Sequence, residues 1–164
     1  MKADYIIGID PDTEHNGYAM IDMDTRKVTV ATPTLPVLLD MVDVVQSMAL
    51  ATDRYLTVFV EAGWMNLPNW HLNFKDSKQM AAAKGRALGR NHQRGMDIIE
   101  LLMYRGIDAK AVAPLRKIWK GKDRKITQRE LEAIVGNVGR TNQEGRDAAI
   151  LAWVKAGLPL RRCT

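Results

Sequence analysis

An apolar run that ends abruptly in an acid most constrains how this chain can fold. Residues 5–10 read Tyr-Ile-Ile-Gly-Ile-Asp, a polar turn beginning with Pro11 follows, and a second apolar run covers residues 17–22. Two apolar runs of this length separated by turn residues predict a β-hairpin. The first strand would then carry Asp10 at its end, on a rigid element from which the carboxylate can face a cleft.

The rest of the chain predicts a mixed α/β order. After a third meander strand at 28–31, the patterns predict a helix, a strand ending in Glu61, a long helix, a short strand and two further helices, at 37–50, 55–61, 77–104, 107–113, 127–135 and 143–156. The fourth and fifth strands are reached by helical crossovers, so we expect them to run parallel to the first. The prediction is a five-stranded sheet, with three antiparallel meander strands and two parallel ones, flanked by helices.

Length and charge bound the class of protein. The 164 residues are expected to form a single domain, 1–164, with a substantial core. A net charge of +5 indicates either a polyanionic partner or a merely basic soluble protein. Cys163 is the only cysteine, which excludes a disulfide within the chain and a cysteine-based zinc site. The chain has neither a membrane-length apolar stretch nor a signal-peptide core at its start, so a cytoplasmic location without membrane contact is expected.

Three glycines interrupt the long helix at positions 85, 89 and 95. Each destabilises a helix interior by roughly 1 kcal/mol relative to alanine. Their spacing indicates either a close backbone approach, to the sheet or to a second subunit, or a weak or kinked helix.

Four acids fall where one strand and helix order could bring them together. Asp10 and Glu61 end parallel strands, and ligand sites in open α/β sheets collect at that edge. Glu144 and Asp147 are three residues apart on the last helix and share one face. Four neighbouring carboxylates would repel each other unless cations lay between them, and oxygen ligands suit Mg²⁺ or Mn²⁺. Two such ions about 4 Å apart can cleave a phosphodiester.

Each acid also has a structural interpretation. Asp10 could start a turn, and Glu61 could be a surface acid at a strand end. Glu144 could complete a capping box with Thr141, and Asp147 could be a first-turn acid favoured by the helix dipole. The basic loop 115–125 could be only a solvated segment.

These motifs together resemble the RuvC-type Holliday-junction resolvases of the RNase H-like superfamily. The matching pieces are Gly8-Ile9-Asp10-Pro11 with Gly17-Tyr18, then Val60-Glu61 with an aromatic three residues on, then Glu144 and Asp147 leading into residues 148–152. The resemblance covers nearly the whole chain. It implies an endonuclease that uses two Mg²⁺ ions, with Mn²⁺ as a substitute, and that acts as a homodimer to nick a four-way DNA junction symmetrically. It also implies Asp10, Glu61, Glu144 and Asp147 as metal-binding catalytic acids.

The same resemblance suggests which residues contact DNA. Trp64 corresponds to an aromatic near the junction centre and would stack on or wedge open a base pair; alternatively, it is a half-buried side chain that pins a loop. Lys125 corresponds to a catalytic lysine that meets the phosphates, with Arg116 or Lys117 as the second cation. The remaining cations of the loop, which would hold the backbone less specifically, are Lys120, Lys122 and Arg124.

Two other functions share parts of this pattern. An actin-like ATPase also opens with an apolar strand, Gly-Ile-Asp and a hairpin, but it needs a second phosphate loop and a far longer chain. A non-catalytic or differently specialised RNase H-like protein, such as a flap or branched-DNA nuclease, would keep the basic loop and Trp64. A non-catalytic protein would have no reason to gather the acids.

Overall fold

The computed structural model describes residues 3–66 and 75–160. Its core is one five-stranded sheet in the order β3-β2-β1-β4-β5. The strands are β1 (Tyr5–Asp10), β2 (Gly17–Asp22), β3 (Val28–Ala31), β4 (Leu56–Glu61) and β5 (Ala109–Val112). β1, β2 and β3 pair antiparallel, whereas β4 and β5 run parallel to β1. The predicted mixed sheet, with three antiparallel meander strands and two parallel ones, is therefore confirmed.

Within residues 3–66 and 75–160, four α-helices and two short 3-10 helices connect and flank these strands. The α-helices are α1 (Leu35–Ala51), α2 (Lys78–Tyr104), α3 (Gln128–Val135) and α4 (Gln143–Lys155). The short helices are η1 (Gly63–Met65), which carries Trp64, and η2 (Lys122–Arg124) in the basic loop. In the described part of the chain, no helix is both long enough and apolar enough to cross a membrane.

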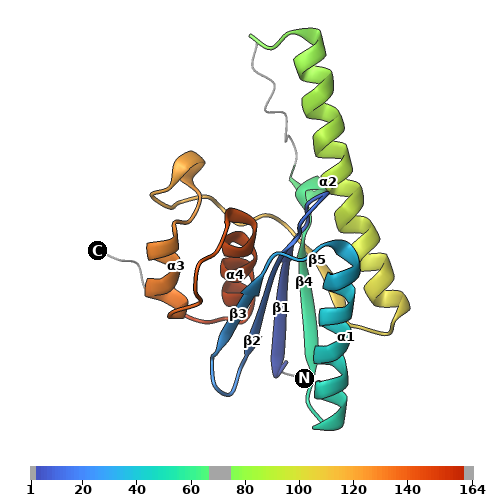
Figure 1. The fold of residues 1–164 in the computed structure, drawn as a ribbon, viewed down its shortest axis with the longest axis vertical. Helices are drawn as coiled ribbons and strands as arrows, with labels where there is room; N and C mark the ends of the chain where they lie inside the picture. Colours follow the sequence, from blue (N-terminus) through green and yellow to red (C-terminus); the bar gives the residue numbers. More distant parts are fainter. Residues whose placement is uncertain (1–2, 67–74, 161–164) are drawn as a thin grey trace.

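The sheet separates two apolar cores. α1 and α2 lie on one face of the sheet, and α3 and α4 lie on the other (Figure 1). Side chains alternate between the faces because the period of a strand is two residues. Ile7 and Ile9 of β1 therefore pack with α1 and α2, whereas Ile6 packs in the core of α3 and α4. The same alternation directs Asp10 toward α4.

Small residues bring α4 unusually close to the sheet. A Cβ added to Gly8 would lie 2.5 Å from the carbonyl oxygen of Ala148 and 2.9 Å from the Cβ of Ala152. A Cβ on Gly17 would lie 2.0 Å from the carbonyl oxygen of Glu144. Only glycine fits at these two contacts, and this sets how near the acids of α4 come to those of the strands.

The predicted helices form with small differences at their ends. α1 begins two residues earlier than expected, because Pro36 lies in its first turn, where a missing N–H costs no hydrogen bond. α2 runs unbroken through its glycines. Gly95 is buried against the Trp64 ring, whereas a Cβ on Gly85 or Gly89 would meet nothing within 4 Å. A close contact therefore explains why position 95 is a glycine, and this contact is with Trp64 of η1 rather than with the sheet.

Candidate active site

Asp10 and Glu61 end adjacent parallel strands on the same side of the sheet. The register pairs Ile9 of β1 with Val60 of β4, so the next residues along, the two acids, follow side by side. Val60 packs in the core formed with α1 and α2. Because side chains alternate along a strand, Glu61 faces the other side of the sheet, toward α4, as Asp10 does. On the other side of β1, Asp10 pairs with Gly17, whose missing side chain leaves room for the first turn of α4.

α4 brings the second pair of acids to this edge. Its N-cap is Asn142, whose side chain accepts a hydrogen bond from the Gly145 N–H. Glu144 therefore lies at the second helical position and is not the glutamate of a capping box with Thr141. A capping box does form at the start of α3, between Thr127 and Glu130. Neither Glu144 nor Asp147 therefore caps α4. Both lie near the N-terminal end of this helix, which packs on β2 and β1.

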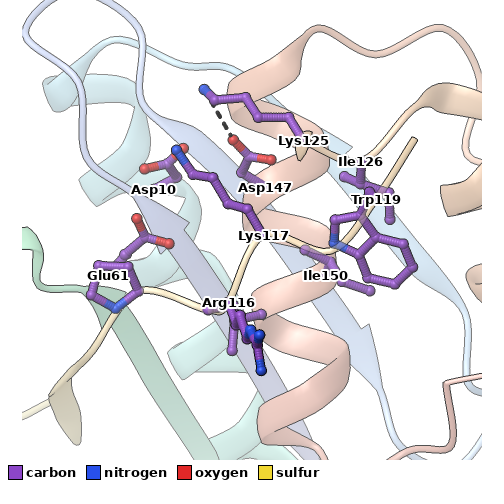
Figure 2. A pocket seen from close by; sticks show the side chains of 11 residues that line it. Asp10, Glu61, Arg116, Lys117, Trp119, Lys125, Ile126, Asp147 and Ile150 are labelled. Atoms are coloured by element: carbon purple, nitrogen blue, oxygen red, sulfur yellow. Dashed lines mark ion pairs between the residues drawn. The ribbon is translucent and has the colours of Figure 1, made fainter. Parts of the chain in front are cut away.

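A cavity of about 120 Å³ lies where these elements meet. Asp10, Glu61 and Asp147 line it, and Figure 2 shows their carboxylates turned toward one another. The loop after β5 closes the opposite wall with Arg116, Lys117, Trp119 and Lys125. Glu144 is not among the lining residues, although its charge acts on Asp10.

Burial and mutual repulsion raise the pKa values of two of the acids. The pKa of Asp10 is well above its ordinary value, first because the carboxyl is desolvated, then because Glu61 and Asp147 repel its charge, with a smaller effect of Glu144. Desolvation and the charge of Asp147 likewise raise the pKa of Glu61. Asp10 therefore lies within electrostatic range of the other three acids predicted from sequence, and Glu61 within range of Asp147.

Two lysines of the basic loop partly offset this negative charge. Lys125 Nζ lies 3.5 Å from Asp147 Oδ2, and its charge lowers the pKa values of both Asp10 and Glu61. Lys117 acts on Glu61 in the same direction, and Figure 2 shows its side chain extended toward the acids while Arg116 points away from them. Of the two candidates for a second cation, Lys117 is the one directed at the carboxylates.

The donor chemistry of the pocket fits a hard divalent cation. Asp10, Glu61 and Asp147 offer only carboxylate oxygens, the ligands that Mg²⁺ and Mn²⁺ prefer. Among residues 3–66 and 75–160, however, no three acidic, histidine or cysteine side chains are already close enough to share a metal ion. The repulsion between the acids and the pairing of Asp147 with Lys125 both oppose a tighter cluster in the metal-free protein.

Gln143 and Arg146 support the pocket, and the sequence reasoning did not single them out. The Gln143 side-chain amide donates a hydrogen bond of 2.7 Å to Asp147 Oδ1, which leaves Oδ2 to Lys125. Arg146 donates to the carbonyl oxygens of Ile126 and Thr141, and thereby fixes the segment that follows Lys125 against α4. The spacing of four between Gln143 and Asp147 on one helix was the available signal.

Asn16 supports the turn after Asp10 and was also missed. Its side chain is 1% exposed, accepts a hydrogen bond from the Asp12 N–H and donates to the Pro33 carbonyl oxygen. On the other side of the turn, Arg94 of α2 donates to the Thr13 carbonyl oxygen. The turn is therefore held at two points, and Asp10 with it.

The remaining predicted residues lie outside the pocket. Trp64 packs its ring on α2 at Gly95 and meets His92 edge-on, with ring centroids 6.1 Å apart. This is the loop-pinning arrangement, and base stacking by Trp64 stays a prediction. Lys120, Lys122 and Arg124 are exposed on the basic loop without lining the cavity.

The raised pKa of Glu61 predicts that this acid destabilises the metal-free fold. In the folded state Glu61 holds its proton above its ordinary pKa of 4.5, so the free energy of unfolding falls as pH rises through that interval. With a chelator at neutral pH, we expect Glu61→Gln to raise this free energy by on the order of 1 kcal/mol and Tm by about 2–4 °C. Thermal unfolding across pH 4 to 8 measures this difference.

The gain should vanish as pH falls below about 4.5, where both states of the wild-type glutamate are protonated. Glu14→Gln, which makes the same change at an exposed turn position, should leave stability unchanged. A gain in Tm that did not depend on pH would contradict the electrostatic explanation.

Comparison with known proteins gives a limited result. No protein-family model matches this chain, and no curated protein sequence does. Among solved structures, Thermus thermophilus RuvC in complex with a Holliday junction substrate aligns with a TM-score of 0.43 and 15% identity over 93% of this chain and 96% of that one. A further T. thermophilus RuvC structure aligns with a TM-score of 0.46 and 16% identity over the same shares. The fold is therefore assigned from the strand order of this chain, and the candidate site from the residues that line its cavity.

Proposed function

We propose that this protein is a metal-dependent, structure-selective endodeoxyribonuclease that resolves four-way DNA junctions by paired symmetric nicks. One observation supports the proposal most strongly. Acids from β1, β4 and α4 face one cavity, and lysines of a basic loop form its opposite wall. Carboxylates suited to divalent cations beside cations suited to phosphate form a site for hydrolysing a polyanionic ester.

Asp10, Glu61, Glu144 and Asp147 would hold Mg²⁺ or Mn²⁺ in two positions. Bound divalent ions activate a water and stabilise the charge of the leaving oxygen. The chain would supply the negative charge that retains the ions, and burial together with neighbouring acids raises the pKa values of Asp10 and Glu61 in the metal-free protein. Gln143 keeps the Asp147 carboxylate in one orientation through its hydrogen bond.

Lys117 and Lys125 would meet the phosphate that is cut. Both side chains already lie against the acids, and a bound cation would release Lys125 from Asp147 to contact the substrate. Arg116, Lys120, Lys122 and Arg124 would hold neighbouring phosphates without reading sequence. Trp64 would meet the bases at the junction centre, and its packing on α2 would keep the ring in position.

A homodimer would give two such sites and so explain paired nicks. Support comes from α2, whose outward face exposes Met96 and Met103. The side chain of Met103 is 61% exposed. Large apolar side chains seven residues apart on an uncovered helix face are typical of helix pairing. Sedimentation at working concentration tests this, and a monomer would contradict it.

The decisive experiment compares a synthetic four-way junction with a linear duplex of the same sequence. We expect two symmetric nicks in the junction only, and only when Mg²⁺ is added. Flap and fork substrates in the same assay test the differently specialised nuclease. Metal-independent binding of every substrate without cleavage would identify a non-catalytic protein instead.

A further inference from the structure

The N-terminal half of α2 is unlike the rest of the molecule in position and charge. Figure 1 shows α2 extending past the end of the sheet at which β1 and β4 terminate. In the described structure, each residue from 82 to 90 is exposed, so this half of the helix has little packing to stabilise it. It projects from the same end of the domain as the candidate active site.

Charge divides α2 at Gly95. Residues 78–94 contain no Asp or Glu and five cations, which are Lys78, Lys84, Arg86, Arg90 and Arg94. Residues 95–104 contain two acids, Asp97 and Glu100, and no cation. The projecting half alone carries a charge of +5, equal to the net charge of the whole chain.

This distribution works against the helix itself. Cations near a helix N-terminus oppose the helix dipole, which favours acids there. Arg86, Arg90 and Arg94 are spaced four apart, so like charges adjoin on one face and repel each other. Gly85 and Gly89 weaken the same segment without a close contact that requires them. An external polyanion would relieve the repulsion, since it binds the guanidinium groups that destabilise the free helix.

The arginine face begins beside the turn that follows Asp10. Arg94, the innermost of the three, donates from Nη2 to the carbonyl oxygen of Thr13, 3.1 Å away, in the turn that follows Asp10. Arg86 and Arg90 continue the same face outward, and within the described residues neither makes an ion pair. We call these three side chains the arginine ridge.

We propose that the arginine ridge binds the phosphate backbone of a DNA duplex arm outside the site of cutting. Guanidinium groups suit phosphate through paired hydrogen bonds. The ridge spans roughly 12 Å along the helix axis, and a duplex presents about one charge per 1.7 Å of its own axis, so a ridge laid along it faces several phosphates. Ala83 and Ala87 each precede an arginine of the ridge by three residues and share its face, and their small side chains let a backbone approach closely.

This inference rests on the proposed function, which supplies the DNA substrate, and adds a contact independent of the basic loop. The test variant is Arg86→Gln with Arg90→Gln; Arg94 is kept because it holds the turn. The matched control is Lys27→Gln with Lys155→Gln, which removes the same charge at two exposed positions, one in the β2–β3 turn and the other at the C-terminal end of α4. Binding to a four-way junction is measured with a chelator between 50 and 200 mM salt.

We expect the ridge variant to lower the slope of log affinity against log salt by about 1.8 per bound protomer, since each duplex phosphate contact contributes about 0.9. At 100 mM salt its affinity should fall about tenfold, while cleavage of saturating junction is unchanged. The control should keep the wild-type slope. Arg86→Lys with Arg90→Lys should restore most of the affinity, which shows that loss of helix structure is not the cause.

A slope for the ridge variant equal to that of the control would overturn the proposal. So would an unchanged slope with an altered oligomeric state, which would assign the ridge to a contact between copies of the chain. If wild-type protein binds DNA through the ridge but cuts no junction, the ridge stands and the proposed nuclease function falls. If the wild type cuts junctions and the ridge variant binds them as tightly, only the ridge fails.

Discussion

We expect Asp10→Asn to abolish the proposed junction cleavage while DNA binding is kept or becomes tighter. The amide has the size of the carboxyl group but no charge, so the site loses a ligand for divalent ions, which supply several kcal/mol of transition-state stabilisation. At 1.36 kcal/mol per factor of ten, we expect a loss of at least about a thousandfold in the cleavage rate. Single-turnover cleavage of a four-way junction with Mg²⁺ measures this loss.

Asp40→Asn is the control for this substitution, because Asp40 is an exposed acid on α1 that does not line the cavity. It should cut at the wild-type rate. The rise in Tm on adding Mg²⁺ is a readout independent of activity. At a Mg²⁺ concentration of a hundred times Kd, binding adds about 2.7 kcal/mol to the free energy of unfolding. Wild type should show this rise and Asp10→Asn should not. Cleavage surviving in Asp10→Asn would contradict the assignment of Asp10 to the metal site.

Gly17→Ala has the largest expected effect on stability. The new Cβ would lie 2.0 Å from the carbonyl oxygen of Glu144, an atom of the helix backbone that cannot rotate away. Either α4 moves off the sheet or the strand distorts, at a cost of about 3 kcal/mol. For a domain of this length that corresponds to a fall in Tm of roughly 6–12 °C, measured by circular dichroism or calorimetry.

Gly85→Ala provides the contrast, since a Cβ there meets nothing within 4 Å and the residue lies inside a helix. It should raise stability, by up to about 1 kcal/mol. Gly17→Ala should also weaken Mg²⁺ binding, because Glu144 and Asp147 move with α4 relative to Asp10. A stable Gly17→Ala protein with unchanged metal response would show that the fit of α4 on the sheet is not what positions the acids.

The order of elements could be predicted from sequence because each signal is local. The strand-ending acids, the capping box at Thr127 and the apolar periodicity of α1 depend only on neighbouring residues. The parallel direction of β4 and β5 followed from their helical crossovers. The ends of α1 and β5 were less well predicted, because a proline in a first helical turn and a strand at a sheet edge are decided by tertiary contacts.

The candidate site could be predicted in its residue types but not in its supports. Strand register and helix spacing sufficed to gather Asp10, Glu61 and Asp147 around one cavity. The roles of Gln143, Arg146 and Asn16 depend on hydrogen bonds to distant backbone atoms that no local pattern reveals. The close approach at Gly17 was equally hidden, since a glycine after a turn reads as turn chemistry rather than as a contact with a helix 127 residues later.

The three-element origin of the pocket has a consequence during synthesis on the ribosome. β1 and β4 emerge early, but Lys125 and Asp147 belong to segments that follow them by more than sixty residues. A nascent chain that has emerged only as far as β4 therefore holds Asp10 and Glu61 without Lys125 and Asp147, because synthesis proceeds from the N-terminal end. The pocket is therefore incomplete, and inactive, until α4 has left the exit tunnel and packed against Gly8 and Gly17.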